Sequence, residues 1–280
     1  MNSSQRPPQG QFLLIDVFKA IAAQVIVFHH LSIYGQISRE ALSLNGWAQW
    51  LSDYGRFAVQ IFLVLGGYLA MMILPRLLDK DGLLKTLINR YLRLVPTFIV
   101  AMLLTVIAAF ITRHYLREDF VGDPETWGQI LSHLFLLHGV LNIDSISAGA
   151  WYIAIDWQLY ATLAILITLF GRTQRLVLVL LVMMCAGLFY FSQFEYFDDW
   201  MIYFIGSYGL GVIAFLISDR GDQSLARLSK GAGYLMVVLL TVSLFMGAGA
   251  KTIVALMIFL VLLIGNLKVL EINLTHPSRW

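Results

Sequence analysis

Long runs of apolar residues alternate along this chain with short polar stretches. Eight of the runs approach the roughly 20 residues that an α-helix needs to cross about 30 Å of hydrocarbon. They cover residues 12–34, 55–75, 94–113, 150–170, 176–193, 200–218, 232–248 and 252–267. The pattern therefore predicts an all-α fold, a polytopic transmembrane helical bundle of about eight spans.

A ninth apolar run, residues 128–141, has the shorter length that is typical of a re-entrant or interfacial helix. The connection between the second and third spans is the most basic part of the chain, with Arg76, Lys80, Lys85, Arg90 and Arg93. Because short basic loops stay in the cytoplasm, we expect the N-terminus there as well. On the same rule the connections 171–175 and 219–231 are cytoplasmic. The spans 94–113 and 150–170 then meet on the outer side, so residues 128–141 cannot cross.

Composition supports one integral-membrane domain over residues 1–280. Hydrophobic residues make up 59% of the chain and charged residues 13%, which excludes a water-soluble globule. The net charge of +2 is too small to predict a nucleic-acid partner. The single cysteine, Cys185, has no partner for an intramolecular disulfide.

Ionisable residues inside spans are costly unless they face the bundle interior, so they indicate candidate functional positions. Lys19 and His30 are eleven residues apart, about three helical turns, and are expected on one face roughly 16 Å apart. Asp156 lies about two turns from the outer end of its span, at the depth expected for His30. A carboxylate can orient an imidazole and raise its basicity, as a general base acting on a sugar hydroxyl requires. The plainer interpretation is an interhelical polar contact that only holds the bundle together.

Arg90 and Arg93 stand three residues apart at the expected cytoplasmic mouth of the third span. Two guanidinium groups there can grip the phosphates of a coenzyme A donor. Anchoring by positive charge or contact with lipid headgroups explains the same spacing equally well. No cysteine, histidine or carboxylate pattern has metal-ligand spacing, so we expect no metal.

Four stretches together resemble the acyltransferase-3 family, the bacterial membrane O-acyltransferases of surface glycans. They are Phe12 to His30 with its Lys19-x10-His30 spacing, Val59 to Leu69, Arg90-x-x-Arg93 followed by Pro96, and Trp151 to Tyr160. The resemblance implies that His30 is catalytic together with Asp156, and that Lys19, Arg90 and Arg93 bind the acyl donor. Asp156 replaces the family's usual Glu, and Gly66 replaces its usual Ser.

The resemblance further implies an acyl-CoA donor, acetyl-CoA in particular. The acceptor would be a hydroxyl of an envelope glycan or lipid-linked carbohydrate, and the protein would lie among the lipids of the bacterial inner membrane. Family members commonly have ten spans, so we expect a C-terminally truncated domain that ends at Pro277 to Trp280. Two other functions stay open: a proton-coupled transporter or flippase that uses the same intramembrane charges, and an inactive scaffold of an envelope-synthesis complex.

Overall fold

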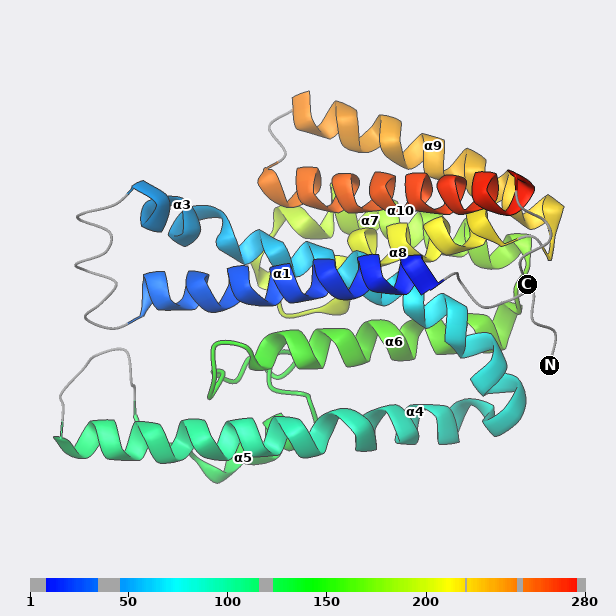
Figure 1. The fold of residues 1–280 in the computed structure, drawn as a ribbon. Helices are drawn as coiled ribbons and strands as arrows, with labels where there is room; N and C mark the ends of the chain where they lie inside the picture. Colours follow the sequence, from blue (N-terminus) through cyan, green and yellow to red (C-terminus); the bar gives the residue numbers. More distant parts are fainter. Residues whose placement is uncertain (1–8, 35–45, 116–122, 220, 246–248, 276–280) are drawn as a thin grey trace. The chain divides into compact units, whose positions relative to one another are not determined.

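A computed structural model of the chain describes residues 9–34, 46–115, 123–219, 221–245 and 249–275. All regular secondary structure in these residues is helical (Figure 1). The longer helices are α1 (Gln9–Ile33), α4 (Val59–Tyr115), α6 (Ala150–Phe170), α7 (Gln174–Phe189), α8 (Met201–Ser218), α9 (Gln223–Phe245) and α10 (Ala250–Thr275). Short helical segments are α3 (Gly46–Tyr54), the 3-10 turn η2 (Gly55–Ala58), α5 (Trp127–Leu134) and the 3-10 turns η4 (Phe191–Gln193) and η5 (Glu195–Phe197). The expected all-α fold is confirmed.

The expected spans fall on these helices. Six helical stretches of the described chain are long and apolar enough to cross a membrane. One of them, Gly46–Tyr115, is 70 residues long and contains two of the expected spans. The last expected span falls on α10, whose described apolar part is Ala250–Gly265. The expected chain end at Pro277 to Trp280 lies outside the described residues.

Two connections expected to be loops are helical instead. The basic stretch after the second span continues α4, which is interrupted only where Gly82 adopts φ 72° and ψ 171°. Only glycine reaches this backbone conformation without steric cost, so Gly82 divides α4 into two helical parts. The connection 219–231 is likewise helical from Gln223 onward, because α9 begins there.

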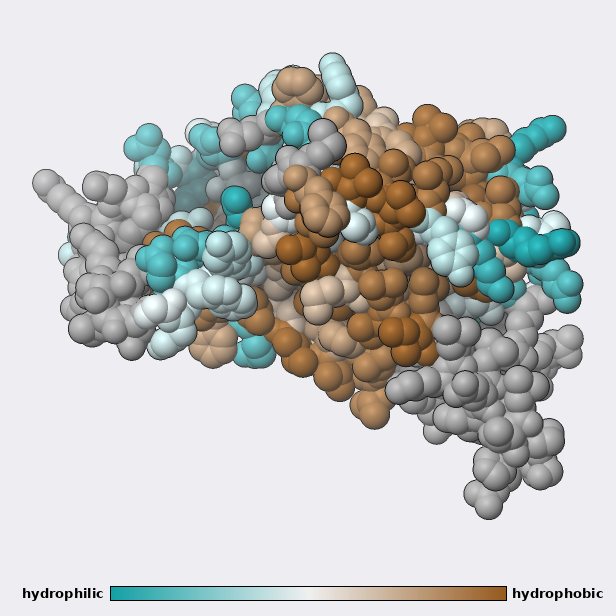
Figure 2. Space-filling model, turned by 90° about the horizontal axis from the view of Figure 1, so that it is seen from above, coloured by the Kyte–Doolittle hydropathy of each residue, from teal (hydrophilic) through white to brown (hydrophobic). Residues whose placement is uncertain are grey.

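The described chain forms two compact units whose boundaries fall within α4 and α8. The first unit combines residues 1–71 with 207–280. In it α1 contacts α3 and η2, and α10 contacts η2 and α9. The exposed side chains of α9 and α10 in this unit include Leu235, Val238, Val242, Ile253 and Met257. Figure 2 shows a broad hydrophobic surface with hydrophilic residues gathered toward its ends, as expected for helices that face lipid.

The second unit, residues 72–206, contains the later part of α4 with α5, α6 and α7. Its small core joins Val95 and Phe98 of α4, Leu136 after α5, and Ala150 and Ala154 of α6. The later part of α4 runs beside α6, and α5 lies next to it (Figure 1). This packing brings residues from three separate parts of the chain to one place.

Candidate active site

Lys19 and His30 lie on one stripe of α1. The helix is continuous through both residues, so eleven steps of about 100° leave their side chains roughly 20° apart. Both side chains are half-buried, next to the fully buried line of Ile15, Ala22 and His29. Neither position is on the exposed side of the helix. Lys19 and His30 therefore both lie on this half-buried stripe of α1.

The His30 ring lies between two other rings near the end of α1. It stacks on Tyr34 with centroids 5.9 Å apart and planes 21° apart, and His29 is 5.4 Å away at 50°. Its Nδ1 is buried and forms no hydrogen bond with any residue the structure describes. A ring nitrogen held in this way is available to a proton from a bound substrate.

His29 has a structural role. Its Nδ1 donates to the backbone carbonyl of Leu51 at 2.8 Å, and its side chain is 5% exposed. Gly55 packs against it so closely that a Cβ there would lie 2.7 Å from the His29 Cβ. His29 therefore ties α1 to α3 and η2.

Arg90 and Asp156 form an ion pair that the sequence did not predict. The Arg90 guanidinium donates to Asp156 Oδ2 at 2.5 Å, linking α4 to α6. The same guanidinium lies over the ring of Tyr160, 4.9 Å from its centroid, in cation–π geometry. Both charged side chains are largely shielded, with exposed fractions of 29% and 15%. The carboxylate and one aromatic ring of α6 thus hold a single arginine.

This ion pair shows how far the Arg90 side chain reaches along α6. Sequence reasoning placed Arg90 at the cytoplasmic mouth and Asp156 near the outer end of its span. Asp156 lies about 9 Å along the axis from the first residue of α6 and about 21 Å from its last residue. The Arg90 guanidinium, at the end of a long side chain, lies at the level of Asp156 because the two groups are within hydrogen-bond distance. This contact between α4 and α6 was not predicted from the sequence.

Arg93 differs from Arg90 although the two belong to one motif. It lies about 60° round the helix from Arg90. Its side chain is exposed, and it forms no ion pair with any residue in the described ranges. Of the two arginines, only Arg93 presents its guanidinium outward. The two arginines that were expected to bind phosphate together therefore differ, since Arg90 is ion-paired and Arg93 is exposed.

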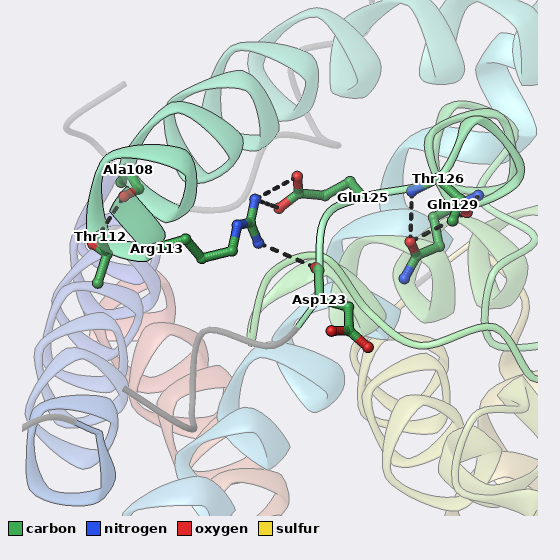
Figure 3. Close-up of polar contacts among 7 residues, drawn as sticks. All are labelled: Ala108, Thr112, Arg113, Asp123, Glu125, Thr126 and Gln129. Atoms are coloured by element: carbon green, nitrogen blue, oxygen red, sulfur yellow. Dashed lines mark hydrogen bonds and ion pairs between the residues drawn. The ribbon is translucent and has the colours of Figure 1, made fainter. Parts of the chain in front are cut away.

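Polar contacts with Arg113 hold the segment between α4 and α6 at residues 123–125. Arg113, near the end of α4, donates to both carboxylate oxygens of Glu125 at 3.0 and 2.8 Å and to the carbonyl of Asp123 at 3.1 Å (Figure 3). Thr126 and Gln129 then form a reciprocal capping box that starts α5. These contacts define where the expected short helix begins. Because α5 has only 8 residues, it is too short to span, as predicted.

The end of α5 is held against the Arg90–Asp156 region. The Tyr91 hydroxyl donates to the carbonyl of Leu134 at 2.6 Å. Tyr91 also meets Trp157 edge to face, with ring centroids 6.5 Å apart. Each of these aromatic residues directly follows one member of the ion pair in sequence. The motif residues Arg90–Tyr91 and Asp156–Trp157 therefore meet as two adjacent pairs.

Two fully buried histidines lie in α5 and in the loop after it; from the sequence they were expected either to line an outer vestibule or to face lipid headgroups. His133 and His138 are both 0% exposed, and their rings stack in parallel 4.0 Å apart. Helical periodicity does not explain the contact between residues five positions apart, because His138 lies in the loop after α5. The contact follows from the conformation of that loop, which the sequence pattern does not predict.

The predicted pairing of His30 with Asp156 joins residues of the two units and stays a prediction. The same holds for an approach of Lys19 to Arg90 or Arg93. Within the described ranges, no three histidine, cysteine or carboxylate side chains gather as a metal site would require.

Comparison with known families identifies the chain. The sequence profile of the acyltransferase-3 family, described as an acyltransferase domain, matches residues 12–274. No curated protein and no solved structure matches. The matched range includes the α1 stripe, both arginines of α4 and the carboxylate of α6. The chain therefore belongs to the acyltransferase-3 family.

Proposed function

We propose that this membrane acyltransferase transfers an acetyl group from cytoplasmic acetyl-CoA to a hydroxyl of an envelope carbohydrate. The observation that supports this most is the half-buried stripe of α1, with Lys19 and His30 roughly 16 Å apart along the axis. That distance separates a site for donor phosphates from a site for chemistry. The donor need only extend its thioester end along the helix to reach His30.

In the proposed reaction His30 acts as general base. Its unprotonated ring nitrogen takes the proton of the acceptor hydroxyl while the oxygen attacks the thioester carbonyl. The tetrahedral intermediate collapses, the C–S bond breaks, and the coenzyme A thiolate takes the proton back from the imidazolium. The products are an O-acyl ester and free coenzyme A thiol, and no external oxidant, metal or base is consumed.

The charged groups of α4 and α6 have separate parts in this proposal. Arg93, whose side chain is exposed, is offered to the donor phosphates, and Lys19 is the second cation expected to contact them. Asp156 binds Arg90 through Oδ2, and a carboxylate has two oxygens that accept several hydrogen bonds. Holding Arg90 is therefore compatible with orienting His30, as the family resemblance implies.

The test uses the full-length protein in lipid nanodiscs with radiolabelled acetyl-CoA and unacetylated envelope polysaccharide. We expect label to move to the glycan with release of free thiol, at a rate that His30→Ala lowers by about 10²- to 10⁴-fold. His114→Ala is the matched control, because His114 is an exposed histidine at the end of α4. Full glycan labelling by a well-folded His30→Ala protein would overturn the catalytic assignment.

The same assay separates the two alternatives. A proton-coupled transporter or flippase leaves acetyl-CoA intact while it moves its substrate across the bilayer. An inactive scaffold neither consumes thioester nor moves substrate. Thioester consumption that depends on added glycan is expected only of the acyltransferase.

A further inference from the structure

Three aromatic rings stack beside α5 in the second unit. The ring centroids of Phe98 of α4 and His133 are 6.4 Å apart, with the ring planes at 17°. The ring centroids of His133 and His138 are 4.0 Å apart, with the ring planes at 5°. His133 lies in the last turn of α5, and His138 lies in the loop that follows. This loop folds back so that the His138 ring covers the His133 ring.

The two imidazoles differ in the number of hydrogen bonds that their ring nitrogens form with the described residues. His133 Nδ1 donates to the Gln129 carbonyl at 2.7 Å, and its Nε2 accepts from the Ile146 backbone N–H at 3.0 Å. These partners fix His133 as a neutral ring with its proton on Nδ1. Neither nitrogen of His138 bonds to any residue that the structure describes, although both atoms are buried. His133 is satisfied by the fold, whereas His138 is not.

A buried imidazole without partners lowers the stability of the fold. A phenyl ring would keep the stack and remove two unsatisfied polar atoms. The backbone of the same loop has a further cost, since buried Leu136 adopts a φ of 57°. Such costs persist where a ligand or a reaction needs the group.

The chemistry of His138 defines what it can bind. Burial, together with the neighbouring His133, lowers the pKa of His138 to about 4, so the ring is neutral near pH 7. A neutral imidazole offers one N–H donor and one lone pair. Its complement is a neutral group that both donates and accepts, which describes a hydroxyl and does not describe a phosphate.

We propose that His138, which is fully buried in this structure, binds a hydroxyl group of the carbohydrate acceptor when the loop after α5 opens. The inference rests on the proposed function, and it adds a residue that contacts the acceptor rather than the donor. By the sequence-based orientation, residues 128–141 lie on the outer side, where an envelope glycan arrives. The segment fixed by Arg113 and Glu125 then serves as the acceptor side of the enzyme.

The test compares wild-type protein with His138→Phe in nanodiscs, using unacetylated envelope polysaccharide from cells that lack this protein. We expect His138→Phe to raise the KM for polysaccharide about tenfold, the effect of one lost hydrogen bond. The KM for acetyl-CoA should not change. The Tm should stay equal or rise, because two unsatisfied atoms are removed. His114→Phe makes the same ring replacement at an exposed site and should change none of these values.

A second pair of measurements keeps the proposal independent of folding and of turnover. His138→Gln retains a donor and an acceptor and should recover part of the lost affinity. Polysaccharide added without acetyl-CoA should raise the Tm of wild-type protein more than that of His138→Phe.

An unchanged KM in His138→Phe would show that the ring holds water only, and would overturn the proposal. A lowered Tm in both His138→Phe and His138→Gln would show a structural ring and overturn it as well. Absence of any acetylation by wild-type protein would instead refute the proposed function, and this inference with it.

Discussion

At the scale of single residues, the environment of Arg90 determines what Asp156 can do. The guanidinium contacts the Asp156 carboxylate and the Tyr160 ring of α6. Removing one charge of a shielded pair leaves the other uncompensated, and that penalty exceeds the net value of the pair itself. Because both groups keep some exposure, the penalty is smaller than for a fully buried pair. Asp156 therefore contributes to stability independently of the catalytic role proposed for it.

We predict that Asp156→Asn lowers the free energy of unfolding by about 1–3 kcal/mol. Asp156→Glu should keep most of the stability, because the longer carboxylate still reaches Arg90. The reversed pair Arg90→Asp with Asp156→Arg should be more stable than the sum of its single changes predicts. Tm and denaturant unfolding in detergent micelles measure all three.

Arg93→Ala serves as the control for this ion pair. Its exposed side chain has no ion-pair partner in the described chain, so its removal should leave the Tm unchanged. It should instead raise the KM for acetyl-CoA. Equal losses of stability in Arg93→Ala and Asp156→Asn would contradict the division between a paired and an open arginine.

At the scale of elements, two glycines set the distance between α4 and α8 within the first unit. A Cβ on Gly67 would lie 1.9 Å from the Tyr208 carbonyl oxygen, and one on Gly211 would lie 1.8 Å from the Val64 carbonyl oxygen. Beside them Ser207 donates to Gln60 Oε1 at 2.5 Å. Small residues let helix backbones approach this closely in a membrane, where packing replaces the hydrophobic driving force. Gly67 of the second motif stretch thus has a packing role.

We predict that Gly67→Ala and Gly211→Ala each destabilise the protein by about 3 kcal/mol or more, because backbone atoms cannot move aside as a flexible side chain can. Thermal unfolding in detergent measures the loss. Gly231→Ala is the matched control, since nothing lies within 4 Å of a Cβ at that helical position of α9. It should stabilise the protein by about 0.5–1 kcal/mol through helix propensity. Tolerance of alanine at Gly67 and Gly211 would show that α4 and α8 are not in close contact.

The stacked histidines predict a pH dependence for the segment after α4. Burial lowers the pKa of both His133 and His138, the latter to about 4, so the folded state keeps both rings neutral. As the pH falls below about 6.5 the unfolded chain takes up protons that the folded chain does not, and stability decreases until about pH 4. Asp199, which lies against Gly139, acts in the opposite direction because burial raises its pKa.

We therefore expect the Tm to decrease between pH 6.5 and 4.5, with a loss of roughly 2 kcal/mol attributable to His138. Tm measured across this range should show a shallower dependence in His138→Phe. A variant with the same pH profile as wild-type protein would place the titration elsewhere.

The elements themselves were largely predictable, and their special positions were not. Helix positions follow from the lengths of apolar runs, which are local properties of the sequence. The continuity of α4 was missed because its charged stretch is polar enough to resemble a loop, and only the backbone at Gly82 shows where the helix bends. The contact of His133 with Ile146 depends on the path of a loop, which no periodicity encodes.

At the scale of the whole molecule, sequence reasoning found the residues of the candidate site more readily than their partners. The stripe of Lys19 and His30 follows from one helix and its period, so it could be derived without a structure. The pair of Arg90 and Asp156 joins α4 to α6 across 66 residues of chain. The rule that basic loops stay in the cytoplasm placed these two residues at different depths. The rule considers only the charge of each loop, so it gives no information about a contact between two helices.

The direction of the chain across the membrane determines whether the proposed donor and acceptor sides are correct, and cysteine labelling can decide it. In a Cys185→Ala background, we predict that Leu84→Cys is cytoplasmic and that Trp127→Cys is on the outer side. Both positions are well exposed, at 73% and 81%. A membrane-impermeant maleimide should label Trp127→Cys in sealed spheroplasts, and Leu84→Cys only after permeabilisation. The reverse pattern would place Lys19 and Arg93 on the side without coenzyme A, and the phosphate role proposed for both would then be wrong.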